Sequence, residues 1–132
     1  MRRSALLAAC VALGSATAAQ AAPPVQMTPA TQRDVRCFML FASAVNDAQK
    51  ANNDKLREAN GLAVMYYYSK INLEAPSLNL VDAVMQEASW MDRNAAVKEV
   101  RATCDAEFQK TAHQLIDIGE KLKQAGSQSP TT

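Results

Sequence analysis

The stretch that decides the fold is residues 97–122, VKEVRATCDAEFQKTAHQLIDIGEKL. Its apolar positions recur at intervals of three and four residues, and residues at this spacing share one face of an α-helix because each advances about 100° around the axis. The pattern predicts a long amphipathic helix that follows Asn94 and ends at Gly126, with Cys104 central in its buried stripe. The stripe consists of Val97, Val100, Cys104, Phe108, Thr111, Leu115, Ile118 and Leu122.

Three further helical patterns precede this segment. With it they predict an all-α fold, a small four-helix bundle of the up-and-down or an irregular type, stapled by one disulfide. No alternating strand pattern, nucleotide-binding glycine motif or internal repeat interrupts them. The three predicted helices begin at Thr28 or Thr31, near Asp54 and near Asn79, and the second and third end near Leu73 and Met91.

The distribution of apolar residues predicts which helix faces are buried. In the second helix, residues 62–68 are apolar or aromatic on nearly every side, so we expect it to be the most buried, with Gly61 allowing a close approach of backbones. In the third helix, Trp90 lies off the apolar stripe. The predicted stripes are Cys37, Phe38, Phe41, Val45 and Ala48 in the first helix and Leu80, Val81, Val84, Ala88 and Met91 in the third.

Residues 1–21 have the pattern of a secretory signal peptide. Two arginines precede an apolar run over residues 5–13, and a small-x-small site ends at Ala21. We therefore expect cleavage near Ala21-Ala22 and a periplasmic or secreted product. A lipoprotein processed at Cys10 is the alternative, which the continuation of the apolar run beyond that residue disfavours.

Cleavage would leave Cys37 and Cys104, on the inward faces of the first and last helices. An even pair of cysteines in an exported chain predicts a disulfide. In the chain-entropy model, closing a loop of this length stabilises the folded state by roughly 4 kcal/mol.

The remaining chain divides by composition into three parts. Residues 22–28 are a predicted disordered leader, residues 29–126 a helical domain and residues 127–132 a disordered tail. No apolar run after the signal peptide is long enough to span a membrane. The oligomeric state is left open.

The charge balance argues against nucleic-acid binding. The chain has 14 basic and 13 acidic residues, and removal of Arg2 and Arg3 with the signal peptide leaves 12 basic residues. Proteins that bind nucleic acids or anionic membranes carry a clustered excess of Lys and Arg, because counterion release dominates their affinity. No such cluster is present.

No set of residues predicts an active site, so we expect a protein that is not an enzyme. The chain has one histidine, His113, which lies opposite the buried stripe of its helix. Metal centres and nucleophilic catalysis need several converging ligands or a positioned base, so no catalytic, metal-binding or cofactor-binding residue is predicted.

Candidate interaction residues are the apolar side chains that lie off the predicted core stripes. They are Met39, Leu40, Tyr68 and Trp90. Each is either packed by a neighbouring segment or exposed, and exposed together they would form a partner-binding patch. The expected function is that of a non-enzymatic periplasmic interaction or chaperone-like protein, whose partner is another periplasmic protein. The alternative is a small-molecule binding module with a cavity between bundle helices.

Three short motifs carry a resemblance. They are Arg36-Cys37, Tyr66-Tyr67-Tyr68-Ser69-Lys70-Ile71 followed by Pro76, and Thr103-Cys104-Asp105-Ala106-Glu107-Phe108. With these motifs the chain resembles small exported helical proteins with one disulfide that are common in alphaproteobacteria. The resemblance implies compartment and fold, and no catalytic residues.

A second resemblance rests on Cys104 and Phe108, four residues apart. This spacing is similar to that in the HdeA-type acid-stress chaperones of the periplasm, small helical proteins with one disulfide. The segment between the cysteines is longer in this chain. That resemblance implies a client-holding activity that acid switches on.

Overall fold

The structure is a computed structural model that describes residues 24–127. The predicted signal peptide 1–21, its cleavage site, the lipidation alternative at Cys10 and tail residues 128–132 lie outside the described residues. Within that range the chain forms helices and no strand, which confirms the predicted all-α fold. The elements are α1 (Pro29–Lys50), α2 (Asp54–Glu74), α3 (Leu80–Glu87), the 3₁₀ helix η1 (Ala88–Asp92) and α4 (Asn94–Ser127).

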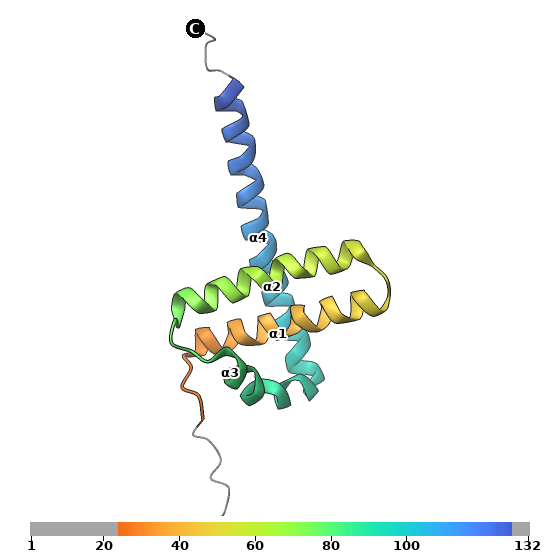
Figure 1. The fold of residues 1–132 in the computed structure, drawn as a ribbon, viewed down its shortest axis with the longest axis vertical. Coiled ribbons are helices and arrows are strands. Elements are labelled where there is room, and N and C mark those ends of the chain that lie inside the picture. Colours follow the sequence, from red (N-terminus) through yellow and green to blue (C-terminus); the bar gives the residue numbers. More distant parts are fainter. Residues whose placement is uncertain (1–23, 128–132) are drawn as a thin grey trace, which may run out of the picture.

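The helices form an irregular bundle around an α1/α2 hairpin (Figure 1). α1 and α2 lie side by side, and α3 packs near the open end of the hairpin. η1 contacts α3 and α4, and α4 crosses the hairpin and extends far beyond it (Figure 1). None of the helices in residues 24–127 carries an apolar stretch of the length needed to cross a membrane.

Side-chain caps begin the first three helices. The hydroxyl of Thr28 accepts from the backbone N–H of Thr31 at 3.1 Å, so α1 starts at the earlier of the two predicted positions. Asn53 caps α2 and Asn79 caps α3 in the same way. Asn52 adopts a φ of 52°, a left-handed conformation that Asn tolerates, in the turn between α1 and α2.

The main core surrounds the disulfide that joins α1 to α4. Cys37 and Cys104 are fully buried, with their Cα atoms 5.6 Å apart. The rings of Phe41 and Tyr67 stack beside them with centroids 5.8 Å apart, and the Tyr67 hydroxyl donates to the Cys104 carbonyl at 2.9 Å. The disulfide predicted from the two inward-facing cysteines is therefore present.

The predicted stripe of the third helix is buried only in part, since Leu80, Val84 and Met91 pack partly buried against the apolar clusters. Ala83, Glu87 and Trp90 are buried at intervals of four and three residues, whereas Val81 is 70% exposed and Ala88 is also exposed. The prediction was wrong for Val81 and Ala88 because Glu87 occupies a core position. Its carboxylate accepts from Arg36 Nε at 2.7 Å, a pairing with α1 that hydrophobic periodicity alone does not reveal.

The prediction that α2 is the most buried helix is also wrong. Its buried residues are Ala63, Tyr67 and Ile71, all on the side that faces α1 and α4. Gly61 makes no close backbone contact, since a Cβ added there would meet no atom within 4 Å. The apolar residues on the other sides of α2 point to solvent.

α4 has the predicted length, but its stripe is covered only in part. Cys104 is buried, and Val100 and Phe108 are partly buried against α1 and α2. Further along the same stripe, Leu115, Ile118 and Leu122 are more than half exposed. The distal half of α4 thus projects beyond the body of the molecule (Figure 1).

Part of the segment predicted as a disordered leader makes defined contacts. The backbone N–H of Val25 donates to Gln86 Oε1 at 2.6 Å, and the Val25 carbonyl accepts from Gln86 Nε2 at 3.2 Å. Val25 and Met27 also pack against a second apolar cluster, formed by Val35, Ile71 and Ala83. The chain before α1 therefore lies along α3, a contact that the sequence did not predict.

Candidate interaction surface

The structure separates the four predicted interaction residues. Leu40 and Trp90 are each only 4% exposed and belong to the core, so neither can contact a partner. Trp90 is covered on one side by the Arg36 guanidinium, 5.0 Å from the ring centroid. Met39 is partly buried against the second apolar cluster, and Tyr68 is 43% exposed. Of the four, Tyr68 alone presents a large part of its side chain to solvent.

Tyr68 belongs instead to a larger exposed surface, which we name the outer apolar face. Its five members are apolar or aromatic and between 43% and 70% exposed. They come from two helices, so no single helical periodicity could identify them as a group. They are Leu62, Met65 and Tyr68 of α2 and Val81 and Met85 of α3.

Two open grooves run through the outer apolar face. The first has a volume of about 460 Å³ and lies between Phe38, Tyr68 and Val84. The second has a volume of about 530 Å³ and lies between Ala42, Val45 and Met65. The remaining lining residues are Asn79, Leu80, Val81 and Met85 in the first groove and Glu58, Gly61, Leu62 and Val64 in the second.

Helical geometry places both grooves on the same face of the hairpin. The α1 residues Phe38, Ala42 and Val45 are spaced by four and three, so they form one stripe along that helix. In α2, Tyr68 and Met65 lie away from Tyr66 and Lys70, which face α4. α4 thus covers the other face of the hairpin and leaves this one open.

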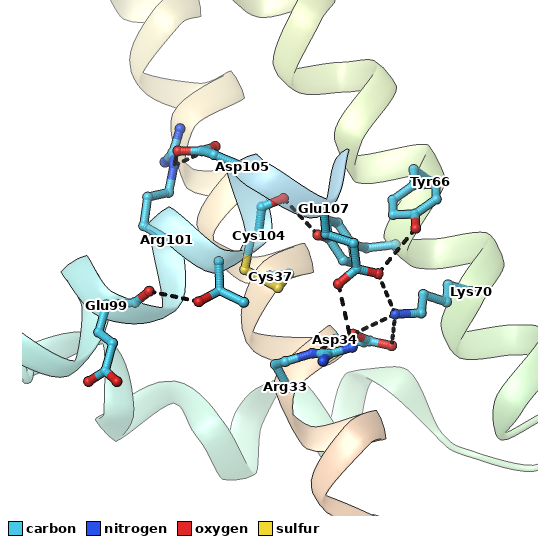
Figure 2. Close-up of a disulfide and its surroundings, with 12 residues drawn as sticks. Arg33, Asp34, Cys37, Tyr66, Lys70, Glu99, Arg101, Cys104, Asp105 and Glu107 are labelled. Atoms are coloured by element: carbon cyan, nitrogen blue, oxygen red, sulfur yellow. Dashed lines mark hydrogen bonds and ion pairs between the residues drawn. A yellow bond between two sulfur atoms is a disulfide. The ribbon is translucent and has the colours of Figure 1, made fainter. Parts of the chain in front are cut away.

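Polar side chains cluster beside the disulfide, where α1, α2 and α4 meet (Figure 2). The Lys70 ammonium lies 3.0 Å from Asp34 Oδ2 and 2.6 Å from Glu107 Oε1. Arg33 pairs with Asp34 at 3.0 Å and with Glu107 at 3.5 Å. Tyr66 donates its hydroxyl hydrogen to Glu107 at 3.1 Å. Both carboxylates are therefore paired with cations.

The pKa values of Lys70 and Glu107 are shifted towards the charged forms of the two groups. Burial alone would raise the pKa of Glu107, but the hydrogen bond and charge of Lys70, with the charge of Arg33, outweigh burial and hold that pKa below its usual value. Burial would lower the pKa of Lys70, yet its bonds to Glu107 and Asp34 raise it. Burial raises the pKa of Tyr67 and so favours its neutral form. Groups held in one charge state link helices and are poorly suited to proton transfer.

His113 is exposed, as its position opposite the stripe predicted. Within residues 24–127, no group of three or more His, Cys, Asp or Glu side chains is arranged to hold a metal ion. The outer apolar face and its grooves are therefore the surface whose chemistry is best suited to binding.

Comparison of the chain with protein-family models, curated proteins and solved structures finds no match. The resemblances to small exported helical proteins and to acid-stress chaperones therefore stay predictions from the sequence.

Proposed function

We propose that this chain is a non-enzymatic periplasmic protein that binds apolar segments of partner or unfolded proteins on its outer apolar face. The observation that carries the proposal is the gathering of five exposed apolar side chains from α2 and α3 around two open grooves. Exposed apolar patches of this kind are typical of protein-interaction sites, because their burial against a partner removes apolar area from water.

Two properties of the outer apolar face suit partners of varied sequence. Met65 and Met85 are 60% and 70% exposed. Their unbranched, polarizable side chains adapt to different apolar surfaces, and methionine is common at binding sites of low sequence specificity. The near-neutral charge of the predicted mature chain adds no strong preference for acidic or basic partners.

The proposed compartment rests on the Cys37–Cys104 disulfide together with the predicted signal peptide. Disulfides persist in oxidising compartments such as the bacterial periplasm and are rare in the cytosol. A periplasmic or secreted location is compatible with this bond.

The test is suppression of aggregation of heat-denatured citrate synthase without any reductant, so that the Cys37–Cys104 bond stays intact, followed by light scattering. We expect the wild-type chain to delay aggregation, and the triple variant Leu62→Ser, Met65→Ser and Met85→Ser to lose most of this effect. The matched control is Leu115→Ser, Ile118→Ser and Leu122→Ser, which removes as many exposed apolar side chains from distal α4. Equal loss in both variants, or no delay by the wild type, would contradict the proposal.

A small apolar ligand is the alternative occupant of the first groove. Its volume of about 460 Å³ lies within the usual range for ligand sites, and Asn79 is the polar residue among its lining. Saturable one-to-one binding of a decyl-chain probe, without any effect on citrate synthase aggregation, would favour this alternative. The spread of the apolar surface over both grooves and beyond the reach of one small ligand favours a protein.

A further inference from the structure

Within residues 24–127, the two exposed methionines both belong to the outer apolar face. Met65 of α2 is 60% exposed and Met85 of α3 is 70% exposed. Each groove has one of them in its lining, Met85 in the first and Met65 in the second. The other three methionines of this range are partly buried against the two apolar clusters, and they are Met27, Met39 and Met91. The accessible thioether sulfur is therefore concentrated at the proposed binding surface.

The cysteines and the tryptophan of residues 24–127 are protected from oxidants. Cys37 and Cys104 are fully buried and joined in a disulfide, so neither offers the thiolate that normally reacts first. Trp90 is 4% exposed, and the Arg36 guanidinium covers its ring. An oxidant that reaches this part of the folded chain therefore meets the two exposed thioethers as its accessible sulfur atoms.

We propose that Met65 and Met85 form an oxidation site through which peroxides lower binding to the outer apolar face. The thioether sulfur attacks one oxygen of hydrogen peroxide, and the O–O bond breaks. The sulfur keeps that oxygen and is oxidised by two electrons to the sulfoxide, while the peroxide is reduced and its second oxygen leaves as water with both hydrogens. The inference rests on the proposed function, since it concerns the control of the same surface.

A sulfoxide changes the chemistry of both grooves. It converts a flexible apolar side chain into a polar one whose oxygen accepts hydrogen bonds. Burial of that oxygen against an apolar partner is unfavourable unless a donor meets it. The second groove has one polar side chain in its lining, Glu58, and a carboxylate accepts hydrogen bonds without donating them. Oxidation of Met65 should therefore weaken contact with apolar segments, because the side chains of the groove cannot satisfy the new oxygen.

Oxidation at these two positions should leave the fold intact. Neither Met65 nor Met85 packs in the apolar clusters that hold the helices together. The new oxygen of each sulfoxide meets water in the free chain. Oxidation of Met39 or Met91, which do pack against these clusters, would instead disturb the packing. The exposed pair thus permits a change of surface chemistry without unfolding.

Selectivity is tested by mass spectrometry of the chain from Ala22 to Thr132 during treatment with hydrogen peroxide. This chain includes every described residue, and its two cysteines form the disulfide, so the peroxide meets no free thiol. We expect the two exposed methionines to gain oxygen at least about five-fold faster than the three partly buried ones. Equal rates at all of these methionines would overturn the proposal.

The effect on binding is measured after catalase has removed the peroxide. The oxidised wild type should delay aggregation of heat-denatured citrate synthase less than its untreated sample does, by a factor of at least about two, with unchanged helicity by circular dichroism. The double variant Met65→Leu and Met85→Leu has no thioether on the outer apolar face, so its treated and untreated samples should agree. The matched control, Met39→Leu and Met91→Leu, removes as many thioethers elsewhere and should respond to peroxide as the wild type does.

Repair identifies the sulfoxide as the cause. Methionine sulfoxide reductases for both sulfoxide epimers, reduced beforehand and freed of small thiols to spare the disulfide, should restore the delay of the oxidised wild type. Each repair returns the sulfoxide oxygen as water and converts a dithiol of the reductase to a disulfide. No restoration, loss of helicity on oxidation, or an undiminished delay when both residues are oxidised would overturn the proposal. An equal loss in the Met65→Leu and Met85→Leu variant would also overturn it.

A separate readout distinguishes failure of this inference from failure of the proposed function. Absence of any delay by the untreated chain would contradict the proposed function. Fluorescence of 1-anilinonaphthalene-8-sulfonate at neutral pH, which needs no protein partner, then reports the apolar character of the surface directly. A fall in fluorescence on oxidation of Met65 and Met85 would support the oxidation site, and unchanged fluorescence would overturn it.

Discussion

Two acidic residues at core positions shape the packing of this small domain. Asp34 is fully buried and pairs with Lys70 and Arg33, while Glu87 is 5% exposed and accepts from Arg36 and from Gln32 Nε2, the latter at 2.5 Å. Burial of a lone carboxylate is strongly unfavourable, so each depends on its cations. These pairs fix which faces of α1, α2 and α3 meet.

Glu107→Gln should lower the free energy of unfolding at pH 7 by about 1–2 kcal/mol, since Lys70 and Arg33 then lose a charged acceptor. The folded-state pKa of Glu107 lies below its unfolded value, so the stabilisation is present above the unfolded value and is lost as pH falls through the lowered folded value. Urea unfolding at pH 7 and pH 3 measures both effects. The difference from wild type should shrink at pH 3, and Glu99→Gln at an exposed position is the control.

Trp90→Ala and Tyr68→Ala should differ in how much they lower the free energy of unfolding, because Trp90 is buried and Tyr68 is exposed. Removal of the buried indole leaves a cavity and should cost about 3–5 kcal/mol of stability, whereas the exposed Tyr68 should cost below about 1 kcal/mol. Chemical denaturation measures both values. Similar losses for the two variants would contradict the burial assigned to them.

At the scale of elements, hydrophobic spacing predicted the positions of the helices correctly. It was less successful in predicting which side chains of each helix are buried. The number of α-helices, the length of α4 and the Cys37–Cys104 bond follow from local patterns, because caps and periodicity act within a few residues. The buried face of α3 depends on the pairing of Glu87 with Arg36, 51 residues away in sequence. A charged residue looks exposed until its partner is known, so the centre of the buried face, at Ala83, Glu87 and Trp90, was missed.

The candidate surface was harder to predict than the fold for the same reason. The apolar run 62–68 looked like a fully surrounded helix, yet α1 and α4 cover only part of α2 and leave Leu62 and Met65 exposed. In α4, the apolar stripe predicts that Leu115 and Leu122 are buried. Periodicity alone does not identify the surface that would bury them. Tyr68 was predicted as a candidate for interaction, and its side chain is exposed. Its neighbours Val81 and Met85 were not predicted, because they belong to α3 and share no periodicity with Tyr68 in α2.

Reduction of the disulfide should lower the stability of the whole bundle. The bond joins residues 67 apart in sequence and is the covalent link between α1 and α4. The chain-entropy model gives about 4 kcal/mol for a loop of this length, a large share of the 5–15 kcal/mol typical of a domain. Urea unfolding with and without reductant measures the difference. An unchanged midpoint would show that α4 is held mainly by its noncovalent contacts.

At the scale of the whole molecule, ion pairs join helices that share few apolar contacts. The Lys70–Glu107 pair links α2 to α4, and the Arg36–Glu87 pair links α1 to α3. At about pH 2, below ordinary carboxylate pKa values, the chain carries a net positive charge, and the 12 basic residues of the predicted mature chain repel one another. The disulfide still holds α1 to α4. We therefore expect acid to loosen the packing without separating these two helices.

Loosening of this kind should expose core residues beside the outer apolar face, and client binding should then increase in acid. Fluorescence of 1-anilinonaphthalene-8-sulfonate from pH 7 to pH 2 measures the exposure, since the dye brightens on accessible apolar surface. We expect fluorescence to rise as pH falls through the carboxylate range while far-ultraviolet circular dichroism retains its helical signal. Glu107→Gln should shift the rise to higher pH, because its α2–α4 ion pair is already lost. A flat response down to pH 2 would exclude acid-activated client holding and leave the outer apolar face as a surface that binds equally at all pH values.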